Sequence, residues 1–165
     1  MPAKKSAAPA TSSLTVGTLA PDFTLTADDG AAVTLKSLRG RAVVLYFYPK
    51  DDTSSCTVEA CEFRDAFPDF DTSNAVILGV SPDSVKSHVK FKQKYELPFA
   101  LLADTEQTVA TLYDVWKEKS MYGKKYMGIM RTTFIIDAQG TLQKIFTNVK
   151  SAGHAAEVMA AVNEL

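Results

Sequence analysis

The apolar run from Ala42 to Tyr48 constrains the fold of this chain more than any other feature of the sequence. Seven consecutive apolar residues, ended by Pro49, are typical of a strand that is buried on both faces. A strand of this kind needs a packed layer on each side of its sheet. The run therefore predicts the central strand of a layered α/β sheet.

Strand and helix patterns alternate on both sides of that run. Strands are predicted at 23–25, 33–35, 75–80, 99–102, 130–137 and 141–148, and helices at 54–68, 84–95, 105–113 and 152–164. The last two strands form a hairpin around Ala138-Gln139-Gly140, and residues 117–128 are a long connection. The alternation predicts an α/β fold with a mixed central sheet flanked by helices. We expect one domain, 14–165, after a flexible tail, 1–13.

Composition excludes several classes of protein. With 165 residues, 46% hydrophobic and 22% charged, the chain has the profile of one globular domain and not of a disordered or disulfide-rich protein. A net charge of -1 gives no basic surface for nucleic acid. The sequence has no apolar run of membrane-spanning length and no signal-like start. We therefore expect a cytoplasmic protein with no nucleic-acid or membrane partner.

Cys56 falls in the first turn of the helix that follows the central strand, just after the N-cap residue types Ser54 and Ser55. Unpaired backbone N–H groups at a helix start favour an anion, and such positions stabilise a reactive thiolate. The alternative is that Cys56 is a small buried apolar residue at a helix start. The position makes Cys56 the first candidate for a nucleophile.

Cys61 lies five residues further along the same predicted helix. In an ideal helix this spacing separates the Cα atoms by about 8.6 Å, whereas a disulfide needs roughly 4.4–6.8 Å. If the two cysteines pair, the helix between them must unwind. The alternative for Cys61 is an inert core cysteine. The spacing is not the C-x-x-C of dithiol oxidoreductases, but the strand-then-helix order around it is typical of a thioredoxin-like relative.

A metal site needs more ligands than two thiols supply. The remaining candidates, His88 and His154, lie on distant predicted helices, where we expect them to be surface or capping residues. We therefore expect no metal and no bound cofactor.

The segment YFYPKDDTSSCTVEACEFRD, residues 46–65, resembles the active-site segment of peroxiredoxins of the Q, or bacterioferritin comigratory protein, subgroup. The resemblance extends through APDFTL (20–25), GVSPDS (79–84), KEKSMYGKKYMGIMRTTFIID (117–137) and the C-terminal helix. It covers nearly all of the chain after the tail, and it implies a thioredoxin-like fold.

The resemblance also assigns roles to single residues. The family pattern P-x-x-x-T-x-x-C falls on Pro49, Thr53 and Cys56, and the active-site arginine falls on Arg131. By this resemblance Cys56 attacks the peroxide, Thr53 donates a hydrogen bond to it, Pro49 shields the thiolate and Arg131 holds thiolate and peroxide together. Cys61 matches the resolving cysteine of members with both thiols on one helix. Without the motif, Arg131 would be a surface charge on a strand, and Pro49 and Thr53 a turn.

Three neighbouring features are less specific. Ser54-Ser55 stands where many members carry Pro-Gly, and serine caps a helix better than it forms a tight turn, which bears on how fast the helix opens. Glu59 is either a partner of Arg131 or a solvated helix carboxylate. The cluster of Trp116, Tyr122, Tyr126 and Met127 either packs or lines the pocket, and packing is the commoner role for such residues.

The resemblance implies a thiol-dependent peroxidase that reduces hydrogen peroxide and organic hydroperoxides. Its cycle passes through a Cys56 sulfenic acid and an intramolecular Cys56–Cys61 disulfide, which thioredoxin or a glutaredoxin-like dithiol reduces. We expect a monomer or weak homodimer. The alternatives are a thiol-disulfide oxidoreductase and a non-enzymatic peroxide sensor whose helix opens on oxidation.

Overall fold

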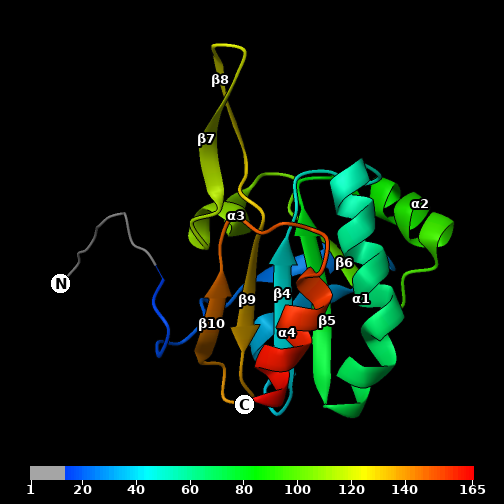
Figure 1. Cartoon of the computed structure of the whole chain (residues 1–165), viewed down its shortest axis with the longest axis vertical. Helices are drawn as coiled ribbons and strands as arrows, with labels where there is room; N and C mark the ends of the chain where they lie inside the picture. The colour runs from blue at the N-terminus through cyan, green and yellow to red at the C-terminus, as the bar shows by residue number, and fades with distance from the viewer. Residues whose placement is uncertain (1–13) are drawn as a thin grey trace.

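The computed structural model describes residues 14–165, which are built around one seven-stranded sheet (Figure 1). Its strands are β2 (Thr24–Ala27), β3 (Ala32–Thr34), β4 (Ala42–Phe47), β5 (Ala75–Ser81), β6 (Ala100–Ala103), β9 (Thr132–Ile136) and β10 (Leu142–Phe146). They lie in the order β10-β9-β4-β5-β6-β2-β3. The β4–β5 and β5–β6 pairs are parallel and the others antiparallel, which confirms the predicted mixed sheet.

Helices cover both faces of this sheet. They are α1 (Ser54–Thr72), α2 (Val85–Tyr95), α3 (Thr108–Leu112) and α4 (His154–Asn163), with a short 3-10 helix, η1, at Leu35–Leu38. All four predicted helices are present. The predicted tail, 1–13, lies outside the described residues, so its flexibility remains a prediction.

Strand β4 is buried on both faces, as its continuous apolar run predicts. Val44 and Tyr46 face the core under α1, α2 and α4. Val43, Leu45 and Phe47 face a second core with α3 and the segment before β2. Strand β4 is an interior strand, with β9 on one side and β5 on the other. The loop that follows it therefore lies between well-packed elements, and α1 starts from a fixed position.

Gly79 on β5 lies directly opposite Tyr46 in the parallel β4–β5 register. A Cβ atom at Gly79 would lie 2.9 Å from both Cζ and the hydroxyl oxygen of Tyr46. The Tyr46 ring stacks on Phe63 of α1, with 4.9 Å between the ring centroids. The missing side chain of Gly79 therefore makes room for the tyrosine that supports α1.

The prediction of a long connection at 117–128 is wrong. This segment forms a second, two-stranded antiparallel sheet of β7 (Trp116–Met121) and β8 (Lys124–Ile129), which projects from the main body (Figure 1). Tyr122 and Gly123 turn the chain with φ values of 52° and 78°, as a two-residue hairpin loop requires. Tyrosine is an unusual first residue for such a turn. Neither face of the hairpin is fully buried, so its strands have no alternating apolar pattern in the sequence.

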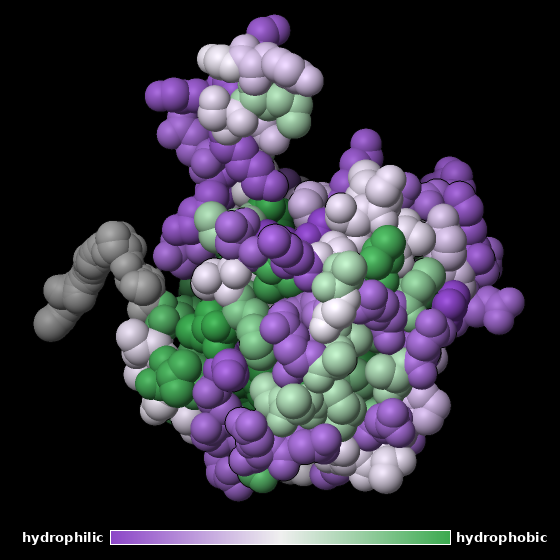
Figure 2. All heavy atoms as spheres, viewed as in Figure 1, coloured by the Kyte–Doolittle hydropathy of each residue, from purple (hydrophilic) through white to green (hydrophobic). Residues whose placement is uncertain are grey.

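Most of the projecting hairpin is hydrophilic, with a small apolar area near its tip (Figure 2). Tyr122 is 97% exposed, and Tyr126 and Met127 are about half exposed. These three residues neither pack into the core nor form a closed pocket wall. Trp116, at the base of the hairpin, is half-buried against the core on the α3 side of the sheet.

Helix α1 also differs from its prediction, because it continues through Pro68 to Thr72. Proline lacks the N–H that would donate within the helix, and it usually ends or kinks one. Here Phe70 is completely buried beyond the proline, and the Thr72 hydroxyl donates to the Pro68 carbonyl at 2.9 Å. Burial of Phe70 stabilises the last turn despite the lost hydrogen bond.

Within residues 14–165, no helix is both long and apolar enough to cross a membrane.

Candidate active site

Cys56 is the third residue of α1, as predicted, and its side chain is almost completely buried. The structure places the N-cap at Thr53, so Ser54 and Ser55 form the first turn and do not cap it. The Thr53 carbonyl accepts the first helical hydrogen bond, from Thr57 N at 2.9 Å. Cys56 therefore belongs to the first turn of a 19-residue helix, where the backbone N–H groups have no partner within the helix.

Arg131 lies next to Cys56 because of the sheet order. It immediately precedes β9, and β9 pairs with β4 so that Thr132 lies opposite Phe47 at the end of the central strand. The backbone of Arg131 is fixed by a hydrogen bond from Val149 N to its carbonyl oxygen, at 3.0 Å. Two residues 75 positions apart in the sequence thus meet where β4 ends and β9 begins.

The Arg131 guanidinium contacts two groups of α1. Nη2 donates to Cys56 Sγ at 3.3 Å, and Nη1 donates to Glu59 Oε1 at 2.6 Å. Glu59 is completely buried and Arg131 is 12% exposed. The open question about Glu59 is thereby settled in favour of the contact with Arg131, since the carboxylate is not solvated.

Burial dominates the electrostatics of Glu59. It raises the pKa of the carboxyl group from 4.5 to about 7, although the contact with Arg131 acts in the opposite direction. Within the described residues, Glu59 Oε2 and the Tyr46 hydroxyl have no hydrogen-bond partner. The neutral form of Glu59 is therefore accessible near neutral pH.

Arg131 remains a cation in this environment. Its burial opposes the charge, but Glu59 and Cys56 together outweigh this effect and raise its pKa. A second cation, Lys119 of the hairpin, is close enough to Arg131 and Cys56 to interact with both electrostatically. Burial, followed by the charge of Arg131, lowers the pKa of Lys119, and its aliphatic stem passes close over Gly128.

The other predicted site residues lie near Cys56 without touching it in the contacts described. The Thr53 hydroxyl donates to the Lys50 carbonyl at 3.0 Å, and Thr53 is exposed. Pro49 is half-buried in the same loop. Cys61 is half-buried on α1 and, like Cys56, is a free thiol. Helix α1 is continuous between the two cysteines.

A shallow groove leads to this site. It is lined by Ser54, Ser55, Val58 and Arg131 on one side and by residues 149–152 on the other. The groove exposes the start of α1 to solvent and gives a small molecule access to Arg131.

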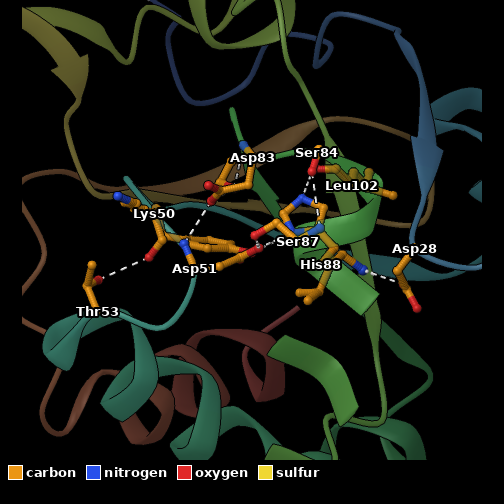
Figure 3. Close-up of polar contacts among 12 residues, drawn as sticks. Asp28, Lys50, Asp51, Thr53, Asp83, Ser84, Ser87, His88 and Leu102 are labelled. Carbon is orange, nitrogen blue, oxygen red and sulfur yellow. Dashed lines mark hydrogen bonds and ion pairs between the residues drawn. The ribbon is translucent and has the colours of Figure 1, made fainter. Parts of the chain in front are cut away.

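A buried polar network lies beneath the loop between β4 and α1, and sequence reasoning missed it (Figure 3). Asp51 of this loop contacts His88 of α2, with 2.8 Å between Oδ2 and Nδ1. The prediction that His88 is a surface or capping residue is wrong, because its side chain is completely buried. The available signal was Asp51 itself, a charged residue in the short loop that follows the buried strand.

The same prediction is wrong for His154. This histidine begins α4 but is buried between Phe63 and Phe146, with edge-on ring contacts to both. Its Nε2 lies 2.7 Å from the Thr133 hydroxyl, and its Nδ1 lies 2.6 Å from Glu157 Oε1. Burial lowers the pKa of His154, with the Glu157 hydrogen bond acting in the opposite direction. In residues 14–165 no group of three or more potential ligands is placed to hold a metal ion.

Comparison with known proteins gives the family of the chain. The sequence profile described as the AhpC/TSA family matches residues 16–145. The chain belongs to the AhpC/TSA family. Within that family it is 52% identical over 147 residues to a putative peroxiredoxin bcp from Coxiella burnetii, covering 89% of this chain and 97% of the relative. It is 49% identical over 150 residues to peroxiredoxin Bcp from Bacillus subtilis, covering 91% and 96%.

Solved structures of the AhpC/TSA family confirm the thioredoxin-like α/β fold. The bacterioferritin comigratory protein of Xanthomonas campestris, studied for its alkyl peroxide reduction activity, superposes with a TM-score of 0.83 at 42% identity over 86% of this chain and 90% of that one. PrxQ of Xylella fastidiosa gives a TM-score of 0.88 at 36% identity over 93% and 98%. The resemblance to Q-type peroxiredoxins is therefore confirmed.

Proposed function

We propose that this chain is a thiol-dependent peroxidase in which Cys56 attacks hydrogen peroxide or an organic hydroperoxide. The observation that carries the proposal is the 3.3 Å contact of Arg131 Nη2 with the buried Cys56 sulfur at the start of α1. A guanidinium next to the sulfur favours the thiolate, and it is placed to stabilise charge that develops on the peroxide oxygens.

The reaction begins when the Cys56 thiolate attacks one peroxide oxygen. The O–O bond breaks, a Cys56 sulfenic acid forms, and the leaving oxygen takes up a proton to become water or an alcohol. Arg131 stabilises the anionic leaving oxygen. We assign to Thr53 a donor role toward bound peroxide, for which its hydroxyl must turn away from the Lys50 carbonyl. Pro49 shields the sulfur from solvent.

Cys61 completes the proposed cycle as the resolving thiol. Its thiolate attacks the sulfenic sulfur of Cys56, so that an S–S bond forms, the S–O bond breaks and the leaving hydroxide takes up a proton to become water. An ideal helix separates the two Cα atoms by about 8.6 Å, which exceeds disulfide geometry. The continuous helix seen between the two thiols must therefore open locally before the bond forms.

An external dithiol then reduces the Cys56–Cys61 disulfide. We propose thioredoxin or a glutaredoxin-like protein in this role, and a monomer or weak homodimer as the working form. Such a cycle requires a reducing compartment, which agrees with the cytoplasmic location predicted from the sequence. No bound cofactor takes part in any of these steps.

The test is peroxide consumption by Cys56→Ser and Cys61→Ser variants with a thioredoxin system as reductant. We expect Cys56→Ser to lose all turnover and to keep its fold, because serine is a good residue at a helix start but not a peroxide nucleophile. Cys61→Ser should consume one equivalent of peroxide and then stop with thioredoxin.

Two results would favour the alternative functions. Reduction of insulin disulfides without peroxide would indicate a thiol-disulfide oxidoreductase. Oxidation of the wild type without repeated turnover, under every reductant tried, would indicate a sensor.

A further inference from the structure

His88 is buried where both ring nitrogens meet oxygen atoms (Figure 3). Nε2 lies 3.0 Å from the Leu102 carbonyl oxygen of β6, and Nδ1 lies 2.8 Å from Asp51 Oδ2. A carbonyl oxygen only accepts, so Nε2 must carry a hydrogen. A contact of Nδ1 with a carboxylate then requires a second proton, either on the ring or on Asp51.

The surroundings of Asp51 decide where this proton lies. Its carboxyl group accepts from the Tyr48 hydroxyl at 2.6 Å and from the Ser87 hydroxyl at 2.8 Å, in addition to His88. Burial raises the pKa of Tyr48 well above its usual value, so Tyr48 remains a neutral donor. The Tyr48 and Ser87 hydroxyls and the His88 ring thus all face the oxygen atoms of this carboxyl group. These contacts fit an imidazolium paired with a carboxylate, a pair that has no net charge.

This ion pair holds the loop that leads into the active site. Asp51 lies two residues before Thr53 and five before Cys56, and its backbone N–H donates to Asp83 Oδ2 at 2.7 Å. The next residue, Asp52, has a positive φ of 60° and contacts Lys94 at the protein surface. Asp51 thus anchors a tightly turned loop to the protein interior, and His88 is the buried partner of the Asp51 carboxyl group.

We propose that His88 is a positioning residue for peroxide reduction: doubly protonated and paired with Asp51, it fixes the loop from Pro49 to Thr53 in the conformation that presents peroxide to Cys56. This inference rests on the proposed peroxidase function. A misplacement of about 1 Å at a reacting centre costs on the order of 10²-fold in rate. Loss of the His88 side chain leaves the Asp51 carboxylate buried without a counterion. Asp51 must then turn toward solvent or take up a proton, and either change displaces the loop that carries it.

The first test is nitrogen NMR of the His88 ring in the reduced wild-type protein. We expect both ring nitrogens to be protonated in the wild type at neutral pH and one nitrogen to be protonated in Asp51→Asn. A singly protonated ring in the wild type would overturn the proposed ion pair, whatever the peroxidase assay shows.

The second test compares two reactions of Cys56 in His88→Asn and Asp51→Asn, each in a Cys61→Ser background so that one thiol reacts. We expect the single-turnover rate with hydrogen peroxide to fall about 10²-fold, while alkylation by iodoacetamide, which needs no peroxide-binding loop, changes less than about threefold. A fold that is merely loosened would expose the buried sulfur and speed up alkylation. Leu142→Ala, in the core on the other face of the sheet, is the control for a general loss of stability and should leave both rates unchanged.

An unchanged peroxide rate in the His88 and Asp51 variants would overturn the positioning role, and so would an equal change in both reactions. Inactivity of the wild-type background toward peroxide would contradict the proposed function instead. If His88→Asn fails to fold, Asp51→Asn, which keeps the shape of the side chain, provides the same comparison.

Discussion

At the scale of single residues, Arg131 links two buried groups that the sequence places on one helix. It donates to the Cys56 sulfur and to the Glu59 carboxyl group with different nitrogens of one planar guanidinium. Only arginine can make both contacts in this fixed geometry, because lysine presents a single ammonium. The orientation of the cation therefore depends on Glu59 as well as on the backbone at β9.

Replacement of Arg131 tests this arrangement. Arg131→Ala and Arg131→Lys should both lower the second-order rate constant for hydrogen peroxide by about 10²-fold or more, measured by stopped flow on the reduced protein. Lysine should restore little of the rate. Arg41→Lys, at a half-exposed arginine far along the sheet, is the control. A wild-type rate in Arg131→Ala would make the arginine purely structural.

Glu59 gives the protein a pH-dependent stability. Its pKa is about 7 in the folded chain against an ordinary value of 4.5, so the folded chain binds this proton more tightly than the unfolded chain does. The resulting stabilisation is complete below about pH 4.5, decreases as the pH rises, and is lost above about pH 7. Relative to Glu59→Gln, the wild type should therefore lose roughly 3 kcal/mol of unfolding free energy between pH 4 and pH 8. Urea unfolding of both proteins across this range measures the difference, and parallel curves would contradict it.

At the scale of elements, α1 carries both thiols and must change shape if they pair. Its first turns pack through Cys56, Ala60 and Phe63, whereas Cys61 and Glu62 are only half-buried. A helix gains most of its stability from packing, so one end can open while the remainder stays in place. Phe70, which is completely buried in the second half of the helix, provides this anchor.

Oxidation should accordingly expose the start of α1. We expect hydrogen exchange to show lost amide protection between about residues 53 and 64 in the disulfide form, with β4 and β5 unchanged as internal controls. Cys61→Ser, treated with the same peroxide, should keep its protection. Equal protection in both redox states of the wild type, or a disulfide found only between chains, would exclude Cys61 as the intramolecular resolving thiol.

At the scale of the whole molecule, the seven-stranded sheet and its two cores form the main body, and the β7–β8 hairpin stands apart from it (Figure 1). Phe134 of β9 is 2% exposed and contacts the rings of Phe47 and Tyr113, whereas Tyr122 at the hairpin tip is 97% exposed. Folding therefore removes nearly all of the Phe134 side chain from water and almost none of the Tyr122 side chain.

Two alanine substitutions should report this division. Phe134→Ala should lower the free energy of unfolding by about 3–5 kcal/mol, because it removes a buried ring and leaves a cavity. Tyr122→Ala should change it by less than about 0.5 kcal/mol. Urea denaturation followed by circular dichroism measures both values. A large loss in Tyr122→Ala would show that the hairpin is bound to another surface in solution.

The parts of the fold that sequence could predict are those with local signals. The apolar run of β4 specifies a strand buried on both faces, and the helix start after it places Cys56 correctly. Arg131 was found through the family motif, since nothing local distinguishes it from a surface arginine.

The missed features depend on contacts distant in sequence. His88 is buried in contact with Asp51, which lies 37 residues away in the sequence. Pro68 is accommodated because Phe70 beyond it packs into the core. The hairpin forms through a turn at Tyr122-Gly123 with no apolar alternation in its strands. Such features require the tertiary partner before they can be recognised.

The close approach of Tyr46 to Gly79 limits how this sequence can diverge. A methyl group at Gly79 would displace the Tyr46 hydroxyl, and the ring would transmit that displacement to Phe63 and hence to α1. An engineer who diversifies the peroxide site would therefore have to keep β5 position 79 free of any side chain or accept a smaller residue at position 46. The tolerance of the reactive helix to mutation is set, in part, on the strand next to the one that leads to the thiol.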